Sequence, residues 1–471
     1  MWAGVSARVF AAPARAVGLV LLGSALLAVL QGAACAEEAP PFSLIRADED
    51  YRYLRNPGAP RTWEDGFKFI PLDGAGEIFL SFGGEWRERM ESYAMPKFGI
   101  GTRNDSYVLQ RVLLHGDLHL GDRLRAFTGL GKHDVFDKDQ PYGPTDRGDA
   151  DLQVAFVDVI PDPDEHLTVR LGRQELLFNP TQRFVSVREG PNIRQSFDGG
   201  RASWKDAGYK IDVFAVRPLV LKPGAFDDAP DHGQRFWGAN VETSLAQATV
   251  LDVYAFELDR ARVRYGAISG TERRSSLGAR LAGQRSPWDY DLEALAQFGA
   301  VGGREIHAWA GSLDTGYMLL TDWSPRLGLR FDAGSGGSDA GNGTVGTFQP
   351  LFPKGAYFNE TSLTSWSNLL AMRPSLRVQP LKSLTLEASI LMRWRQNPAD
   401  AVYLQPSTPI ASTLNNRARE IGQAYGLDAA WKVDRNFTLA VEVVHQKAGP
   451  AITRAGGHDS DLAMLITQFR F

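Results

Sequence analysis

The most constraining feature of the sequence is an alternation of apolar and polar residues, repeated in segments of about ten residues. In the first clear segment, apolar Leu80, Phe82 and Trp86 alternate with polar Glu85 and Arg87. Successive side chains of a β-strand point to opposite faces, so such a segment has one apolar and one charged face. Glycine, aspartate, asparagine and proline separate the segments. This pattern is typical of outer-membrane barrel strands, which meet lipid on one face and water on the other.

The connections between the segments alternate between short and long. Gly121-Asp122 and Asp434-Arg435 are tight turns. The long polar stretches are 134–149, 221–233, 332–361 and 397–416. Because a single-chain barrel favours an even strand number, we predict an all-β fold, a transmembrane antiparallel β-barrel of about 18 strands with short periplasmic turns and long extracellular loops. Such a barrel leaves an aqueous channel. A soluble β-sandwich is the alternative, whereas the lack of a fixed repeat argues against a propeller or solenoid.

The first 36 residues have the layout of a cleavable signal peptide. Arg8 and Arg15 precede an apolar run from Val17 to Leu30, and a small-x-small motif follows at residues 34–36. The run is shorter than the ~20 residues of a membrane-spanning helix, which argues against a membrane anchor. We therefore predict that residues 1–36 are removed during export.

Two further regions follow the signal peptide. Residues 37–75 are rich in proline, aspartate and arginine and lack clear alternation. We expect a first strand near Phe42-Ser43-Leu44 and then a periplasmic or lumen-lining stretch. Residues 76–471 are the predicted barrel. The chain ends on Phe471, and a terminal phenylalanine on an alternating strand resembles the signal recognised by the outer-membrane assembly machinery. The expected partners are that machinery, outer-membrane lipid and lipopolysaccharide.

Arginine is far more frequent than lysine, at 40 against 11 residues. The planar guanidinium suits fixed recognition of carboxylates, although a GC-rich genome also explains the bias. Strand parity places Arg87, Arg89, Arg111 and Arg125 toward the lumen, where they would attract anions. The alternative is a ladder of ion pairs with acids on the same face, such as Glu85, that stiffens the wall.

Regular alternation breaks between Arg183 and Arg201. We hypothesise that this segment narrows the pore and that its arginines grip carboxylates bidentately. The alternative is an extracellular loop held by arginine–aspartate pairs through Asp198. Arg170 falls on the polar parity of its strand, whereas Arg173 does so only if a bulge follows Gly172. The ten candidate pore-lining and solute-binding residues are Arg87, Arg89, Arg111, Arg125, Arg170, Arg173, Arg183, Arg188, Arg194 and Arg201.

Signals for metals and enzymes are weak. His115 and His119 share a strand face, but residues two apart on a strand lie about 6.6 Å apart, so a structural role is expected. Asp332, Asp339 and Asn342 are a weak calcium candidate in a glycine-rich loop, with a simple solvated loop as the alternative. No other cofactor is expected. Common hydrolase, metalloprotease and phosphate-loop motifs are missing, so we do not predict an enzyme. The net charge of −4 does not indicate nucleic-acid binding.

Several blocks of the sequence resemble the alginate export family of outer-membrane proteins. The blocks are Tyr51–Arg55 with Phe69–Leu72, Leu80–Arg87, Leu109–Asp122, Gly172–Leu176, Pro191–Arg194, Phe197–Gly199, Thr347–Pro353 and Ala356–Phe358. They follow one another in a consistent order over nearly all of the chain after the signal peptide. The resemblance implies an eighteen-stranded barrel with lumenal arginines that attract a polyanionic uronate chain.

From these features we predict a channel in the bacterial cell outer membrane. The expected solute is anionic, an alginate-like polysaccharide or a related uronate, which passes through an arginine-lined lumen. A general or small-carboxylate-selective porin on the same scaffold is the first alternative. A structural barrel that conducts nothing is the second.

Overall fold

A computed structural model describes residues 40–471 except 60, 247, 266–267 and 338–342. The predicted signal peptide, residues 1–36, lies outside the described residues. Eighteen long strands form the wall. They are β2 (Ile78–Ala94), β3 (Asp105–Leu120), β4 (Leu124–Phe136), β5 (Gly148–Val159), β6 (Leu167–Gln174), β7 (Phe197–Asp206), β8 (Tyr209–Val220), β10 (Gln234–Ala246), β11 (Thr249–Tyr265), β12 (Ile268–Arg285), β13 (Trp288–Val301), β14 (Arg304–Met318), β15 (Arg326–Gly334), β17 (Leu369–Leu381), β18 (Leu384–Trp394), β21 (Glu420–Lys432), β22 (Phe437–Ala448) and β23 (Ser460–Arg470).

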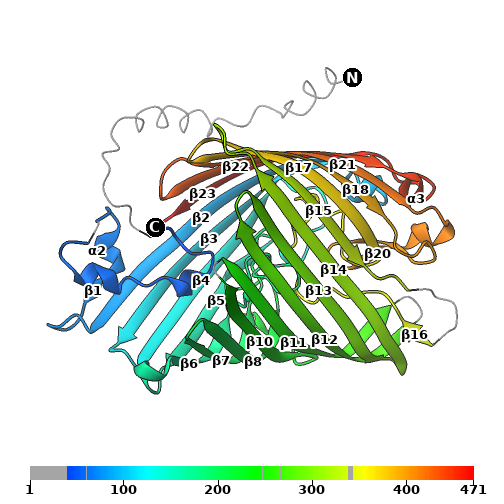
Figure 1. Cartoon of the computed structure of the whole chain (residues 1–471). Helices are drawn as coiled ribbons and strands as arrows, with labels where there is room; N and C mark the ends of the chain where they lie inside the picture. The colour runs from blue at the N-terminus through cyan, green and yellow to red at the C-terminus, as the bar shows by residue number, and fades with distance from the viewer. Residues whose placement is uncertain (1–39, 60, 247, 266–267, 338–342) are drawn as a thin grey trace.

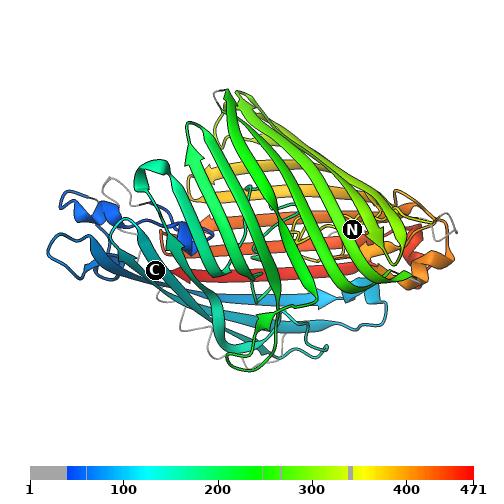
Figure 2. The same ribbon diagram turned by 90° about the horizontal axis from the view of Figure 1, so that it is seen from below.

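Each wall strand pairs antiparallel with its neighbours, and β23 pairs with β2 to close the sheet. The closing register runs from Glu85 opposite Arg470 to Ala94 opposite Asp461. Figure 2 shows the red C-terminal strand beside the blue N-terminal strands. The predicted fold class and the strand number of about 18 are confirmed. Among the described residues, no helix has the length and apolarity needed to span a membrane.

The remaining elements are short, and those labelled in Figure 1 lie toward the two ends of the barrel. They are β1 (Ile70–Pro71), β9 (Ala229–Pro230), β16 (Thr344–Val345), β19 (Val402–Leu404), β20 (Thr408–Ile410), α2 (Asp65–Lys68), α3 (Pro450–Thr453) and the 3-10 turns η1 (Arg46–Asp48), η2 (Arg52–Arg55), η3 (Pro96–Gly99), η4 (Pro163–Glu165) and η5 (Ala411–Asn415). β1 and α2 lie with the short turns, and β16, β20 and α3 lie with the long loops. We call these the short-turn end and the long-loop end.

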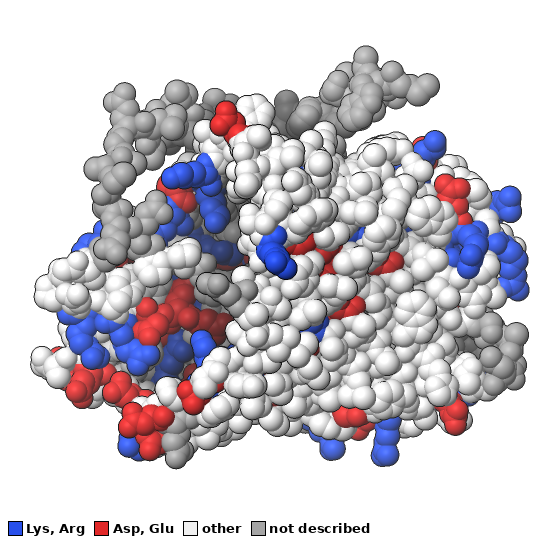
Figure 3. All heavy atoms as spheres, in the orientation of Figure 1, with Lys and Arg blue, Asp and Glu red and all other residues white. Residues whose placement is uncertain are grey.

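The wall strands have the predicted alternation, with apolar side chains pointing outward and charged side chains pointing into the lumen. Outward Trp86 and Leu114 have exposed fractions of 55% and 52%, whereas inward Arg87 and Arg111 have 2% and 0%. Large apolar side chains on an exposed outer face are what a lipid-facing wall requires. In Figure 3 much of the visible face is uncharged, a few acidic and basic side chains show across its middle, and most charged side chains lie toward the two ends. The alternation therefore separates a lipid face from a charged lumen.

The N-terminal segment, residues 40–77, does not begin with the expected strand. Phe42-Ser43-Leu44 has no strand structure. Proline at positions 40 and 41 cannot donate a backbone hydrogen bond to a neighbouring strand. The edge of β2 that extends beyond β23 is instead covered by β1, with Ile70 opposite Leu80. The start of the segment enters the lumen at the short-turn end, where Ile45 and Ala47 pack against wall residues of β4 and β5.

Candidate functional site

Three long connections from the long-loop end fold into the barrel. They are residues 175–196, which we call the constriction loop, 335–368 and 395–419. The amide of Phe352 donates to the oxygen of Phe184 at 2.9 Å, and Lys354 donates to Gln182 at 3.0 Å. The amide of Ser365 donates to the oxygen of Tyr403 at 3.2 Å. The three connections therefore form one hydrogen-bonded layer inside the lumen.

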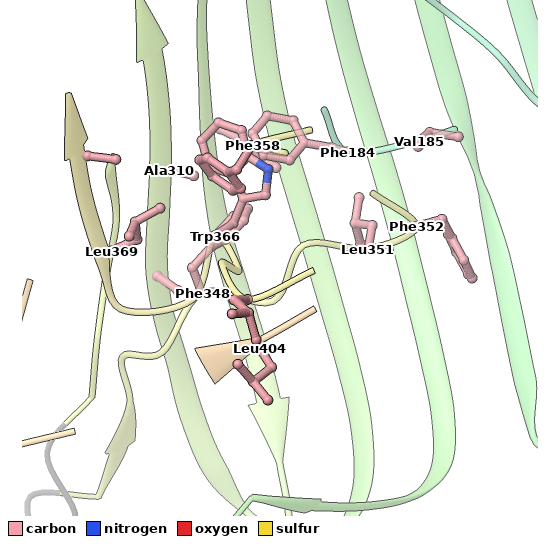
Figure 4. Close-up of a cluster of buried hydrophobic side chains, with 14 of the residues drawn as sticks. Phe184, Val185, Ala310, Phe348, Leu351, Phe352, Phe358, Trp366, Leu369 and Leu404 are labelled. Atoms are coloured by element: carbon pink, nitrogen blue, oxygen red, sulfur yellow. The ribbon is translucent and has the colours of Figure 1, made fainter. Parts of the chain in front are cut away.

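A core of aromatic side chains fixes this layer. Phe184 of the constriction loop contacts Phe348 and Trp366 of the 335–368 connection, with ring centroids 5.5 and 5.1 Å apart. Figure 4 shows these rings gathered inside the sheet beside Phe358. All four have exposed fractions of 4% or less. Burial of a large apolar side chain contributes about 2–3 kcal/mol, so the layer is a packed part of the fold.

Most of the predicted lumenal arginines form ion pairs with the wall. Arg125 donates to both oxygens of Asp117 at 2.7 Å. Arg170 donates to both oxygens of Asp158 at 2.7 and 2.8 Å. Arg201 pairs with Asp212 at 2.7 Å. These three arginines face the lumen as predicted, but each guanidinium is matched by a carboxylate, as the ion-pair ladder requires.

A second group of arginines holds the loops. Arg87 donates to the backbone oxygens of Glu189 and Pro191 at 2.6 and 3.0 Å. Arg111 donates to the Glu85 carboxylate at 2.7 Å and also to the Glu189 carboxylate. Because these contacts link β2 and β3 to the constriction loop, their main effect is to position that loop.

Arg89, Arg183 and Arg194 act in the same way. Arg89 pairs with Glu360 of the 335–368 connection at 2.7 Å. Within the constriction loop, Arg183 pairs with Asp291 and Glu293 of β13 at 2.6 and 2.8 Å, and Arg194 pairs with Glu175 at 2.8 Å. The pairs of Arg89 and Arg183 tie the two connections to the wall, and the pair of Arg194 with Glu175 lies within the constriction loop.

Arg173 does not share the lumenal face of Arg170. The pairing of β6 with β7 is continuous, so no bulge follows Gly172 and the parity is not corrected. Arg173 instead donates to Asp198 at 2.8 Å and to the oxygen of Asp228 in the connection before β10. The predicted role of Arg173 in lining the pore is therefore wrong, because the regular strand turns this side chain away from the lumen.

Arg188 differs from every other predicted arginine. Across the described part of the chain, no carboxylate or carbonyl accepts a hydrogen bond from its guanidinium. The residue is partly exposed, with a left-handed φ of 52°, and only its amide is held, by Ser186 Oγ at 3.0 Å. Burial, unopposed by any acid, lowers the pKa of Arg188 to about 10, so the side chain remains charged at neutral pH. It lies between Val187 and Glu189, both of which are anchored.

The structure also has a lumenal cavity that was not predicted from the sequence. Its volume is about 390 Å³, and it is lined by residues of β15, β17, β18, β21 and β22 and by the turn at 356–359. Its charged residues are Arg330, Arg373, Arg377, Glu387, Asp428 and Glu442. Strand parity in β15 and β17 was the available signal, because Arg330 and Arg373 occupy the polar parity of their segments.

The proposed calcium candidate is not supported by the position of Asp332. This residue lies in β15, not in a loop, and its exposed fraction is 3%. Its carboxylate already accepts from Ser312, Tyr357 and Arg330 at 2.8, 3.0 and 2.9 Å. Asp339 and Asn342 lie outside the described residues. The histidines have structural contacts: His115 stacks on Phe127, and His119 meets Asp117 at 3.1 Å.

Another group of acids lies near the long-loop end. Carboxylate oxygens of Asp151, Asp227 and Asp228 lie within 4.8 Å of one another. One oxygen of Asp151 accepts from the amides of Asp227 and Asp228 at 2.8 and 2.9 Å. These hydrogen bonds hold the connection between β8 and β10 in place, so the cluster has a structural role.

The alginate export family model matches residues 78–465. No curated protein sequence matches the chain. Solved structures share the fold. OccD3 (OpdP) of Pseudomonas aeruginosa is 12% identical with a TM-score of 0.57, and the alignment covers 86% of this chain and 92% of that one. OccK2 (OpdF) of the same organism, in complex with glucuronate, is 13% identical with a TM-score of 0.54 and coverage of 86% and 99%. OccAB1 of Acinetobacter baumannii is 11% identical with a TM-score of 0.56 and coverage of 86% and 97%.

Two observations now agree. The family model spans nearly all of the barrel, and the closed eighteen-stranded wall has the architecture of outer-membrane channels. The chain is a bacterial outer-membrane β-barrel and belongs to the alginate export family.

Proposed function

We propose that the protein is an outer-membrane channel for anionic solute, an alginate-like polysaccharide or a related uronate. The observation that carries this proposal is the unpaired guanidinium of Arg188 on the constriction loop. Because the neighbouring lumenal arginines are matched by carboxylates, Arg188 supplies a net positive charge where the lumen is narrowed. A solute carboxylate about 6 Å away would gain roughly 3 kcal/mol at an effective dielectric constant near 20.

The other arginines support this site indirectly. Arg87 and Arg111 hold Glu189, the residue after Arg188, while Val187 before it is buried among apolar side chains. With both neighbours held, the backbone that carries the charged side chain keeps its place. A fixed charge in a low-dielectric channel concentrates anions and needs no rearrangement when they arrive.

Ion selectivity tests the proposal. Arg188→Gln removes the unpaired charge, and we expect the reversal potential in a KCl gradient across a planar bilayer to shift from anion preference toward neutrality. Arg201→Gln is the matched control, because it removes the same charge from a lumenal pair with Asp212 outside the constriction loop. A shift as large in Arg201→Gln, or no shift in Arg188→Gln, would count against the proposal.

A small-carboxylate channel is the second candidate. Two observations favour it: three connections fold into the lumen, and the fold is shared with OccK2 (OpdF), whose solved structure contains glucuronate. Block of single-channel current separates the two functions. An exporter of polymer should be blocked by oligouronates at much lower concentrations than by glucuronate, whereas a small-carboxylate channel should bind the monomer at least as well. A barrel without measurable conductance would exclude both.

The lipid face and the C-terminal strand fit the expected partners. We assign recognition by the outer-membrane assembly machinery to β23 and the terminal Phe471, and we expect lipid and lipopolysaccharide around the apolar wall. Phe471→Ala should lower the yield of heat-modifiable, folded barrel in cells, while the purified variant should refold in detergent as the wild type does. Equal yields in cells would remove this assignment.

A further inference from the structure

The cavity beside the 335–368 connection has a basic side and an acidic side. It extends from the turn at Ala356–Asn359 to Thr385 and Ala430, which lie near the short turns of β17–β18 and β21–β22. A solute that crosses the lumen in either direction therefore meets this cavity between the loop layer and the short-turn end. Its volume of about 390 Å³ lies within the range of small-molecule sites, about 300–1,000 Å³.

The basic side is a pair of arginines on neighbouring strands. Arg330 of β15 lies directly opposite Arg373 of β17. Like charges directly opposite one another destabilise a sheet unless other groups offset them. Arg330 donates from Nε to Asp332 at 2.9 Å, and Arg373 donates from Nη2 to Glu387 at 2.5 Å. Glu387 is shared with Arg377, which lies 2.7 Å away, so this pair of arginines is only partly neutralised.

Arg330 also has an unused hydrogen-bond donor. Its Nη2 is buried and has no hydrogen-bond partner among the described residues, although the side chain lines the cavity. The guanidinium lies over the ring of Tyr357, 4.4 Å from the ring centroid, which fixes its plane. A buried unpaired donor of a charged group is costly, and a ligand carboxylate would satisfy it.

The acidic side faces these arginines from the next strands. Asp428 of β21 lies opposite both Glu387 and Glu442. In the described part of the chain, no basic side chain lies within ion-pair distance of Asp428 or Glu442. Glu442 accepts a hydrogen bond from the amide of Glu360 at 2.9 Å and shares a side-chain hydrogen bond with Asp428, and its exposed fraction is 8%. The remaining oxygens of both residues can accept hydrogen bonds from hydroxyl groups.

We propose that this cavity is a binding site for a hydroxylated carboxylate, a sugar acid about one ring in size. Its carboxylate lies between Arg330 and Arg373, and its hydroxyl groups donate to Asp428 and Glu442. This inference rests on the proposed function, since the solute enters through the same lumen. It adds the chemical requirement that carboxylate and hydroxyl groups be present on one molecule.

Three probes of similar ring size test that requirement. Glucuronate has both kinds of group, glucose lacks the carboxylate, and cyclohexanecarboxylate lacks the hydroxyl groups. We expect glucuronate to interrupt single-channel current at concentrations at least tenfold lower than either of the others. Equal block by cyclohexanecarboxylate would overturn the role of the acidic side, and equal block by glucose would overturn that of the arginines.

Substitutions then assign the site. Arg330→Gln and Arg373→Gln should each weaken glucuronate block about tenfold, and Asp428→Asn should weaken glucuronate block while leaving cyclohexanecarboxylate unchanged. Arg326→Gln is the matched control: this arginine lies on the same strand and pairs with Asp289 and Asp314, but it does not line the cavity. If Arg326→Gln weakens block as much as the cavity variants do, the assignment is wrong.

Folding and the proposed function are checked separately. Heat-modifiable migration on gels reports folded barrel, and Arg330→Lys, which keeps the charge but loses the planar donor pair, replaces Arg330→Gln if that variant does not fold. Calorimetric titration of detergent-solubilised protein with glucuronate tests the cavity even in a channel without anion preference. A wild-type channel without anion preference therefore contradicts the proposed function. Glucuronate binding that is equally strong in the wild type and in the Arg330 and Arg373 variants contradicts this inference.

Discussion

Arg194 of the constriction loop donates a 2.8 Å hydrogen bond to the backbone oxygen of Leu44, and this contact joins the loop to the N-terminal segment. Beside it, Ile45 and Ala47 of the segment are buried together with Val187 of the loop. The N-terminal segment enters from the short-turn end, and the loop enters from the long-loop end. They meet inside the barrel, one residue from Arg188, so the segment supports the proposed charged site.

The first prediction concerns this support. Arg194→Gln leaves Glu175 and Glu189 without their shared arginine in a buried site, and breaking a buried ion pair from one side costs about 3–5 kcal/mol. We expect single-channel recordings to show repeated flicker between conductance levels, with an intermediate effect in Arg194→Lys. Arg52→Gln, which breaks an exposed pair with Asp50, should behave as the wild type does. A steady current in Arg194→Gln would show that other contacts suffice to hold the loop.

The second prediction is a pH dependence of the N-terminal segment. Lys68 is fully buried, and its Nζ donates to the oxygen of Phe82 at 2.9 Å. Burial lowers the pKa of Lys68 from 10.5 to about 7. Between these values the released segment binds a proton that the docked segment lacks. Docking is therefore weakest below pH 7 and is strengthened as the pH rises from about 7 toward 10.5.

Limited proteolysis of the folded barrel measures this effect. In the wild type the segment should be cleaved faster at pH 6.5 than at pH 9. This ratio of rates should be larger than in Lys68→Met, in which the titrating group is absent. If the rate at pH 6.5 divided by the rate at pH 9 is the same in the wild type and in Lys68→Met, Lys68 does not control docking.

The wall was predictable from the sequence, whereas the interior was not. Parity is a local property of each strand, so Trp86 and Arg87 could be assigned to opposite faces without knowing their neighbours. Whether a lumenal arginine is free depends on carboxylates that are distant in sequence, such as Glu189 for Arg111, 78 residues away. A first strand was also expected near Phe42-Ser43-Leu44, but β1 pairs with the free edge of β2 in its place. Pairing between residues distant in sequence therefore explains why the free lumenal arginines and the first strand were predicted incorrectly.

The third prediction concerns the 395–419 connection. Arg395 has an exposed fraction of 0%, and its guanidinium donates to backbone oxygens. The acceptors are Asp400 at 3.0 Å, Thr413 at 3.1 Å, Asn416 at 3.0 Å and Ala418 at 2.8 Å. Arg395→Gln leaves several of these oxygens unsatisfied, at a local cost on the order of 3 kcal/mol.

Hydrogen exchange of residues 395–419 measures that cost. We expect faster exchange in this connection and unchanged exchange in β18 and β21. Arg419→Gln is the control, because this arginine is exposed and donates to one backbone oxygen, that of Gln396. Equal exchange in the two variants would show that the loop is held by its apolar contacts.

The last prediction tests the lipid face by depth. Leu114 and Leu120 share the outward parity of β3, with exposed fractions of 52% and 43%, but Leu120 is the final residue before the short turn. A lysine at the bilayer midplane of a barrel costs about 2–4 kcal/mol, and one near the interface costs about 0–1 kcal/mol. Leu114→Lys should therefore lower the free energy of unfolding from lipid vesicles by that larger amount, and Leu120→Lys should scarcely change it. Urea titration followed by tryptophan fluorescence gives both values. Equal losses in the two variants would mean that position 114 does not lie deep in hydrocarbon, and an unchanged Leu114→Lys would mean that this face does not meet lipid.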